Sequence, residues 1–113
     1  MKMLQVTLHT DNMEESVRFY SEVVGLKVQK TIADQIVFMA DSRDDTLIEL
    51  ISSDDVDYVN GDISVGFKCS DPVKIRAKLI NNGYEPTDII SPEESVEFFF
   101  LKDPNGLRIQ FHN

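Results

Sequence analysis

The sequence predicts an α+β fold built from two similar halves, and three observations support this prediction. Two segments carry the apolar spacing of an amphipathic helix, and each follows a short segment rich in β-forming residues. Each helical segment is followed by further strand-like segments. The order of the elements is the same in both halves, which is typical of an internal duplication. We therefore expect two βαβββ modules.

The first half begins with a strand over residues 3–9, which alternate loosely and are rich in β-formers. Asn12 is expected to cap the following helix, and Glu15 completes a capping-box pattern. Gly25 stands where a helix commonly ends. The predicted buried stripe of this helix is Met13, Val17, Tyr20 and Val24. Three strands are then predicted, over residues 26–32, 35–40 and 46–51.

The second half follows a polar, acidic segment over residues 54–61, which we interpret as a linker. A strand is predicted over residues 62–69, and residues 70–72 supply an N-cap and a proline suited to the first helical turn. The predicted buried stripe of this helix is Val73, Ala77 and Ile80. Two strands, a turn and a last strand then follow, over residues 84–90, 96–102, 103–106 and 107–112.

The two halves can be aligned with each other residue by residue. Residues 8–10 match residues 67–69 at an offset of 59, and residues 47–50 match residues 108–111 at an offset of 61. A chain of 113 residues fits one compact domain. We expect a single domain over residues 1–113, with module 1 over 1–53, the linker over 54–61 and module 2 over 62–113.

Charge and cysteine content exclude several functional classes. Eleven basic against twenty acidic residues give a net charge of −9, which argues against binding to nucleic acids or anionic membranes. The single cysteine, Cys69, excludes an internal disulfide framework and has no basic cluster nearby to make it reactive. The longest apolar run is short, and the first residues do not resemble a signal peptide. We expect a cytoplasmic protein.

Several local sequence marks resemble those of one known superfamily. They are residues 11–20 continuing to residues 24–26, residues 70–72 at the start of the second helix, and residues 103–106 before the last strand. With the duplicated unit, they make the chain similar to the vicinal oxygen chelate superfamily, which includes glyoxalase I, bleomycin-resistance proteins and extradiol dioxygenases. The resemblance implies that the modules form a curved mixed β-sheet trough with the helices outside, and that the chain forms a homodimer.

The resemblance also assigns four positions that face the trough, where metal-using members carry their ligands. These positions are Gln5, Glu49, Ser64 and Gln110. Ser64 replaces an imidazole and Gln110 replaces a carboxylate, so only Glu49 offers a negative charge to a divalent ion. An amide also cannot accept a proton at neutral pH, as the base of a metal-dependent member must. We therefore expect no metal and no other cofactor, with a divalent metal as the alternative.

Two histidines leave a second donor set open. His9 follows Gln5 by four residues and His112 follows Gln110 by two, so each pair shares one face of its strand. With Glu49 they would form a site displaced toward the end of the trough. Otherwise both histidines lie at strand ends without a chemical role. The candidate ligand-binding residues are therefore Gln5, His9, Glu49, Ser64, Gln110 and His112.

Three further features concern chemistry on the strands. Glu49 stands in an otherwise apolar strand and is the candidate catalytic base. Lys68 and Arg108 would attract a carboxylate or phosphate of a ligand, or else only keep the rim of the trough soluble. Residues 98–100 are three phenylalanines, so aromatic rings point to both faces of their strand. We expect one face to pack in the core and the other to line the pocket.

Three functions fit these observations. The first is a metal-independent small-molecule-binding protein of the glyoxalase/bleomycin-resistance type, whose acidic field favours cationic or neutral ligands. The second is a glyoxalase-I-like, metal-dependent lyase with Glu49 as the base. The third is a non-catalytic regulatory or structural domain in which apolar side chains fill the trough. The sequence does not decide whether the chain is an enzyme.

Overall fold

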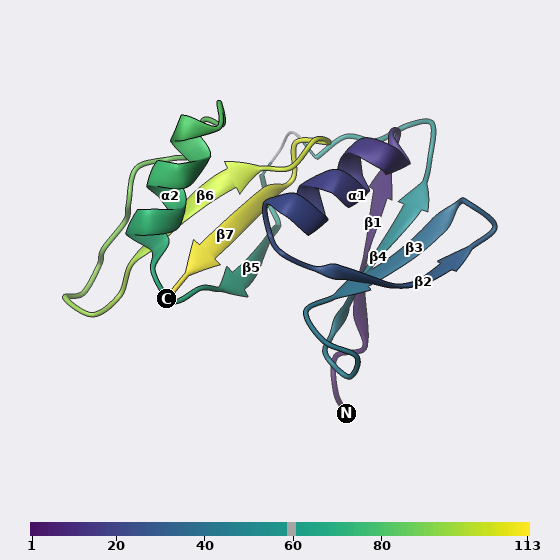
Figure 1. Cartoon of the computed structure of the whole chain (residues 1–113), viewed down its shortest axis with the longest axis horizontal. Coiled ribbons are helices and arrows are strands. Elements are labelled where there is room, and N and C mark those ends of the chain that lie inside the picture. Colours follow the sequence, from purple (N-terminus) through teal and green to yellow (C-terminus); the bar gives the residue numbers. More distant parts are fainter. Residues whose placement is uncertain (59–60) are drawn as a thin grey trace. The chain divides into compact units, whose positions relative to one another are not determined.

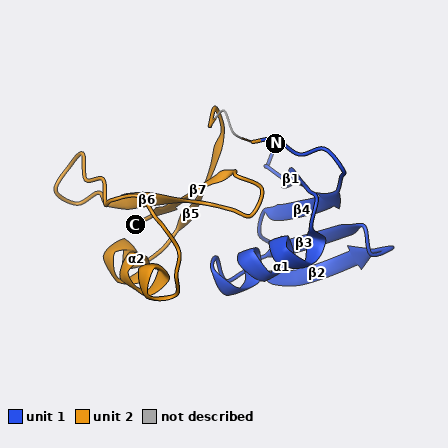
Figure 2. Cartoon of the chain, turned by 90° about the horizontal axis from the view of Figure 1, so that it is seen from above, with its two compact units in different colours: residues 1–57 blue, residues 58–113 orange. Residues whose placement is uncertain are grey.

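The computed structural model describes residues 1–58 and 61–113, and the chain divides into two compact units (Figures 1 and 2). Unit 1 comprises Met1–Asp57 and unit 2 comprises Tyr58–Asn113. The boundary falls inside the predicted linker, of which residues 59 and 60 lie outside the described residues. The assignment of the whole chain to a single domain stays a prediction.

Unit 1 has the predicted βαβββ order. Its elements are β1 (Gln5–Thr10), α1 (Met13–Glu22), β2 (Lys27–Ile32), β3 (Ile36–Ala40) and β4 (Leu47–Ser52). The four strands form one mixed sheet in the order β1-β4-β3-β2, in which β1 and β4 are parallel and the other pairs are antiparallel. The first and last strands of the unit are therefore neighbours.

Unit 2 repeats this arrangement with one strand fewer. Its elements are β5 (Ser64–Lys68), α2 (Pro72–Asn81), β6 (Phe98–Lys102) and β7 (Arg108–His112). The sheet order is β5-β7-β6, with β5 and β7 parallel and β6 antiparallel to β7. Two mixed sheets, each with its own helix, confirm the α+β class.

The strand register confirms the alignment of the two halves. In unit 1 Thr7 lies opposite Glu49, and in unit 2 Gly66 lies opposite Gln110. The offset of 59 relates Thr7 to Gly66, and the offset of 61 relates Glu49 to Gln110. The duplication therefore extends from the order of the elements to the pairing of individual residues.

The start of α1 agrees with the prediction in one half of its capping box. The Asn12 side chain accepts a hydrogen bond from the Glu15 backbone N–H at 3.1 Å. The Asn12 N–H, however, donates to Thr10 Oγ1 at 3.1 Å and not to Glu15. The predicted stripe is only partly right, because Met13, Val17 and Val24 are half-buried. The buried residues of α1 are Ser16, Phe19 and Tyr20.

The turn between β2 and β3 has an unusual backbone. Ala33 and Asp34 both have a positive φ, of 49° and 55°, and Gln35 N donates to Ile32 O at 3.1 Å to close the turn. Two left-handed residues in a row match the right-handed twist of a two-residue hairpin. An alanine in this conformation is strained, because its Cβ crowds the backbone.

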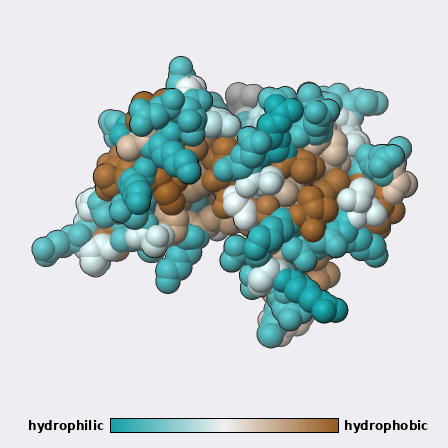
Figure 3. Space-filling view, in the orientation of Figure 1, coloured by the Kyte–Doolittle hydropathy of each residue, from teal (hydrophilic) through white to brown (hydrophobic). Residues whose placement is uncertain are grey.

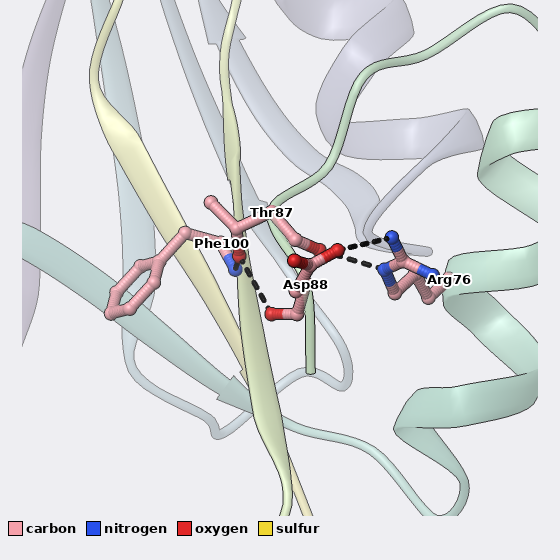
Figure 4. A network of polar contacts seen from close by, with 4 residues as sticks. All are labelled: Arg76, Thr87, Asp88 and Phe100. Carbon is pink, nitrogen blue, oxygen red and sulfur yellow. Dashed lines mark hydrogen bonds and ion pairs between the residues drawn. The ribbon is translucent and has the colours of Figure 1, made fainter. Parts of the chain in front are cut away.

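The predicted strand over residues 84–90 is not formed, apart from a single bridge between Ile90 and Phe98. Thr87 N donates to Phe100 O, and Phe100 N donates to Thr87 Oγ1, both at 2.9 Å (Figure 4). The Thr87 hydroxyl thus accepts the hydrogen bond that a backbone carbonyl would accept in a regular strand pair.

The predicted buried stripe of α2 is also wrong. Its members are exposed, at 49% for Val73 and 45% for Ile80, with Ala77 exposed between them. Hydrophobic residues accordingly gather over α2 in Figure 3. The side that faces the sheet carries Pro72, Ile75, Arg76 and Leu79. Arg76 bonds Thr87 O at 2.7 Å and the Asp88 carboxylate at 3.2 Å from this side of the helix (Figure 4).

Each sheet packs one face in the core of its unit and leaves the other face open. The packed face of unit 1 includes Leu8, Val37, Met39, Ile48 and Leu50. The packed face of unit 2 includes Phe99, Leu101, Ile109 and Phe111. Phe99 is fully buried and stacks on Phe111 at 4.8 Å. Its neighbours Phe98 and Phe100 point to the open face, as predicted for this strand.

Candidate functional site

The first open face is the side of the unit 1 sheet away from its packed core. Because strand side chains alternate, it carries every second residue of β1 and β4, with Phe38 of β3 beside them. These residues are Gln5, Thr7, His9, Phe38, Leu47, Glu49 and Ile51. Most of them are apolar or neutral, and Glu49 is the only carboxylate in this set.

Glu49 is held in place by two neighbours on β1. Gln5 Nε2 donates to Glu49 Oε1 at 2.9 Å, and Thr7 Oγ1 donates to the same oxygen at 2.6 Å. The short second distance is typical of a hydroxyl that bonds a charged carboxylate. We call these three residues the Glu49 cluster. Its geometry fixes one carboxylate oxygen and leaves Oε2 for another donor.

A shallow hollow of about 490 Å³ lies next to the Glu49 cluster. Gln5 belongs to both, whereas Glu49 does not line the hollow. Its walls include Phe38 and Leu47 and the basic side chains of Lys30 and Arg43. The hollow combines apolar walls with a few polar groups, which is the composition of small-molecule sites.

The second open face is the corresponding side of the unit 2 sheet. The register arranges nine residues in three rows across β5, β7 and β6. The rows are Ser64-Arg108-Lys102, Gly66-Gln110-Phe100 and Lys68-His112-Phe98. None of the nine residues is acidic.

Aromatic contacts order several side chains on the second open face. The Arg108 guanidinium carbon lies 4.8 Å from the centre of the Phe100 ring. The His112 ring stacks on Phe98, with centres 5.4 Å apart and planes within 5°. Beside them, a Cβ on Gly66 would lie only 3.1 Å from Gln110 Oε1. The glycine thus leaves room for the Gln110 amide to lie close to the sheet.

The structure brings some of the predicted site residues together. Gln5 and Glu49 share a hydrogen bond, whereas Ser64 and Gln110 lie on adjacent strands of the second open face. His9 lies on the first open face, and His112 Nδ1 lies 2.7 Å from Asn113 O.

Sequence reasoning missed the roles of Thr7 and Lys102. Thr7 bonds Glu49, and Lys102 completes one row of the second open face. Each shares its strand face with residues that were already candidates, so period-two alternation is the signal that could have found both.

The donor sets do not fit a tightly held divalent ion. No group of three or more His, Cys, Asp or Glu side chains is placed to hold a metal within residues 1–58 and 61–113. The displaced His9, Glu49 and His112 set would combine residues of both units and stays a prediction. Apart from Glu49, the side-chain oxygen donors on the two faces belong to amides and hydroxyls, which compensate no positive charge. We derive no metal-dependent step.

Cys69 follows β5 and is half-buried. Burial raises the pKa of its thiol, and the nearby Asp71 carboxylate raises that pKa further. The thiol is therefore protonated near neutral pH and is a poor nucleophile. This agrees with the absence of a basic cluster around it in the sequence.

The fold and the two open faces define a small α+β protein made from a duplicated unit, with its polar chemistry on the sheet faces away from the packed cores. A family model of the Glyoxalase/Bleomycin resistance protein/Dioxygenase superfamily matches residues 2–111. The chain therefore belongs to this superfamily, as the sequence marks predicted.

Solved structures with a similar fold include several glyoxalase-like proteins. A possible glyoxalase from Bacillus cereus is 20% identical with a TM-score of 0.80, and the match covers 100% of this chain and 99% of that chain. The trypanothione-dependent glyoxalase I of Leishmania major is 20% identical with a TM-score of 0.79, covering 100% and 86%. Lactoylglutathione lyase from Agrobacterium tumefaciens is 14% identical with a TM-score of 0.74, covering 98% and 92%.

These identities are low, so the likeness concerns the fold alone. No match is found among the curated proteins. None of the helices in the described part of the chain has the length and apolar character needed to cross a membrane.

Proposed function

We propose that this chain binds a small molecule on the open faces of its sheets, without a metal ion. The observation that carries the proposal is the Glu49 cluster, in which two donors from β1 hold one oxygen of the Glu49 carboxylate. A carboxylate fixed in this way needs little reorganisation to accept a hydrogen bond from a ligand. The adjacent hollow has room for part of a small molecule.

The recognition groups differ between the two faces. On the first open face, Glu49 Oε2 accepts an N–H or O–H of the ligand while Phe38 packs against its apolar part. On the second open face, Ser64, Gln110 and His112 offer hydrogen bonds beside the rings of two phenylalanines. The proposed ligand-binding residues are Gln5, His9, Glu49, Ser64, Gln110 and His112, with Thr7 as a positioning residue for Glu49.

A metal-dependent lyase is the alternative function, with Glu49 as its catalytic base. The similar structures named glyoxalase I and lactoylglutathione lyase favour this alternative, although they share only the fold with this chain. The donor chemistry argues against it, because Ser64 and Gln110 stand where the resemblance would place a histidine and a carboxylate.

The family resemblance also supports a homodimer and a cytoplasmic location as parts of the proposal. Light scattering coupled to size-exclusion chromatography tests the first, and a mass of one chain would contradict it. Cell fractionation with an antibody against the chain tests the second, and recovery in the membrane or culture medium would contradict it.

The test of the proposed function is a small-molecule screen by thermal shift with EDTA present, followed by calorimetry of the hits. We expect ligands to bind with the chelator present, and Glu49→Gln to weaken them about tenfold. Glu22→Gln removes the same charge from an exposed position on α1 and should leave the affinity unchanged.

Two outcomes contradict the proposal. Near-stoichiometric retention of added Ni, Zn, Mn or Mg, lost in Glu49→Ala, would support the lyase and direct assays to a thiol–ketoaldehyde adduct. Affinities that do not respond to Glu49→Gln would remove the Glu49 cluster from the binding site.

A further inference from the structure

The acidic charge of the chain is unevenly distributed between its units. Residues 1–57 contain five basic and twelve acidic residues, a net charge of −7. Residues 58–113 contain six basic and eight acidic residues, a net charge of −2. Three of the six basic residues in unit 2 lie on its second open face: Lys68, Lys102 and Arg108. A locally positive surface thus exists on a strongly acidic protein.

Two of the acidic residues near these cations in the sequence accept hydrogen bonds from backbone N–H groups. Asp103, next to Lys102, is buried and accepts hydrogen bonds from the backbone of Asn105 and Leu107 at 2.8 and 3.0 Å. Asp71 accepts from Lys74 N at the start of α2. Asp62 lies two residues before β5 begins at Ser64, so it is outside the residues of β5 that pair with β7.

The cations on the second open face have no anionic partner in the described residues. The two ion pairs found in residues 1–58 and 61–113 join Arg18 to Glu14 and Arg76 to Asp88. Arg108 instead lies over the Phe100 ring, which orders the guanidinium without using its N–H groups. Its planar fork therefore remains available for an oxyanion.

We propose that the second open face binds the oxyanion of a small organic molecule, a carboxylate, phosphate, phosphonate or sulfate, whose flat apolar part packs on Phe98 and Phe100. This inference rests on the proposed function and names the ligand class of one of its faces. It replaces the expectation of a cationic or neutral ligand, which followed from net charge alone. The charge next to the ligand decides, because distant charges are screened at physiological ionic strength.

The middle row of the face explains where the ligand lies. Gly66 has no side chain, so the backbone of β5 is accessible between Lys68 and the Arg108 end of the face. The Gln110 amide lies beside it with Oε1 toward Gly66, so its Nε2 is the atom that can donate an N–H to the same anion. The Phe98 and Phe100 rings, 5.8 Å apart and nearly perpendicular, form the apolar side. Anion and ring of the ligand are thus recognised by different strands.

The test is a titration of the full chain with phenyl phosphate, followed by ¹H–¹⁵N NMR at low salt. We expect the largest shifts in residues 64–68, 98–102 and 108–112. Benzylammonium has the same ring with the opposite charge and should cause no comparable shifts. Inorganic phosphate should bind the same residues more weakly, because it has no ring to pack on the phenylalanines.

Matched variants identify the residues responsible. Arg108→Gln and Lys68→Gln should each weaken phenyl phosphate about three- to fivefold. Lys74→Gln removes the same charge from the exposed side of α2 and should have no effect. Phe100→Leu should weaken phenyl phosphate but leave inorganic phosphate nearly unchanged. The dispersion of each variant's NMR spectrum verifies that it is folded.

Three results would overturn the inference. They are the absence of shifts on the second open face, equal shifts of that face with benzylammonium and with phenyl phosphate, and an effect of Lys74→Gln as large as that of Arg108→Gln. If any of these occurs while the screen still yields ligands that depend on Glu49, only the inference fails. If no ligand depends on Glu49, the proposed function fails whatever phenyl phosphate does.

Discussion

The two units share a backbone arrangement but carry different polar groups at equivalent positions of their open faces. In both, the first and last strands are parallel neighbours, and Thr7–Glu49 in unit 1 corresponds to Gly66–Gln110 in unit 2. The hydrogen-bonded Glu49 carboxylate of unit 1 thus corresponds to the Gln110 amide of unit 2, which shares its face with three basic residues. The packed faces constrain side chains by volume, whereas the open faces do not. The comparison shows that strand pairing and core are retained while the open face is free to change.

The turns that lead into the last strands also differ between the units, in the burial of an aspartate. In unit 1 the exposed Asp45 carboxylate accepts from Ser42 N and Ser42 Oγ at 3.1 and 2.8 Å. In unit 2 the buried Asp103 carboxylate accepts from two backbone N–H groups. Each turn therefore contains an aspartate that accepts two hydrogen bonds, but the two aspartates differ in burial.

Core substitutions at equivalent positions should have the largest effects. Leu50 and Phe111 are related by the offset of 61 and are both buried. We expect Leu50→Ala and Phe111→Ala each to lower the free energy of unfolding by about 3–4 kcal/mol, because each leaves a cavity in a packed face. Urea unfolding followed by circular dichroism measures both. A loss below about 1 kcal/mol in either variant would break the equivalence of the two cores.

Replacing the two turn aspartates should lower the free energy of unfolding by different amounts, because only Asp103 is buried. Asp103→Ala is expected to cost about 2 kcal/mol, because two backbone donors lose a charged acceptor in a buried site. Asp45→Ala should leave the free energy of unfolding nearly unchanged, because water replaces the lost bonds. The same urea measurements compare them, and equal losses would contradict the role of burial.

Exchanging the carboxylate and the amide should make the faces resemble each other. Glu49→Gln is expected to lower the free energy of unfolding by about 1 kcal/mol, because both bonds to Oε1 become neutral. Gln110→Glu should change stability little, because the new carboxylate lies near Lys68 and Arg108. It should weaken phenyl phosphate severalfold by competing for these cations. Tighter binding of phenyl phosphate in Gln110→Glu would contradict the proposed role of the face.

The smallest effect is expected in the β2–β3 turn, which has no tight counterpart in unit 2. Replacing Ala33 by Asn and Asp34 by Gly supplies residues that adopt a positive φ with little strain. We expect the double variant to raise the free energy of unfolding by about 0.5–1 kcal/mol. Ala33→Val, with a β-branched side chain, should lower it. Thermal unfolding monitored by circular dichroism measures both, and the opposite order would show that the turn is not strained.

Features that depend on neighbouring residues could be predicted from the sequence. Asn12 caps α1, Asp71 and Pro72 start α2, and Asp103 and Gly106 form the last turn, because each acts within a few residues of its own position. The rotation of α2 could not be predicted in this way. The side that faces the sheet carries Pro72, Leu79 and Arg76, and the partners of Arg76, Thr87 and Asp88, lie beyond the helix.

The candidate site was predictable to a similar degree. The resemblance placed Gln5 and Glu49 at matching positions, and the structure joins them by a hydrogen bond. The bond from Thr7 to Glu49 requires the register of two strands 42 residues apart, which no local pattern gives. Net charge averages over both units and hides the acid-free second open face, so it and the proposed oxyanion site point to different ligands.

The parallel pairing of first and last strands also determines when a binding face can exist during folding. Thr7 and Glu49 meet only after the intervening helix and hairpin have formed or collapsed, since closing a long loop costs chain entropy that later contacts must offset. A unit in which β1 and β4 are not paired therefore has no assembled Glu49 cluster. Ligand binding to that cluster reports completion of the sheet and stabilises only the fully paired state.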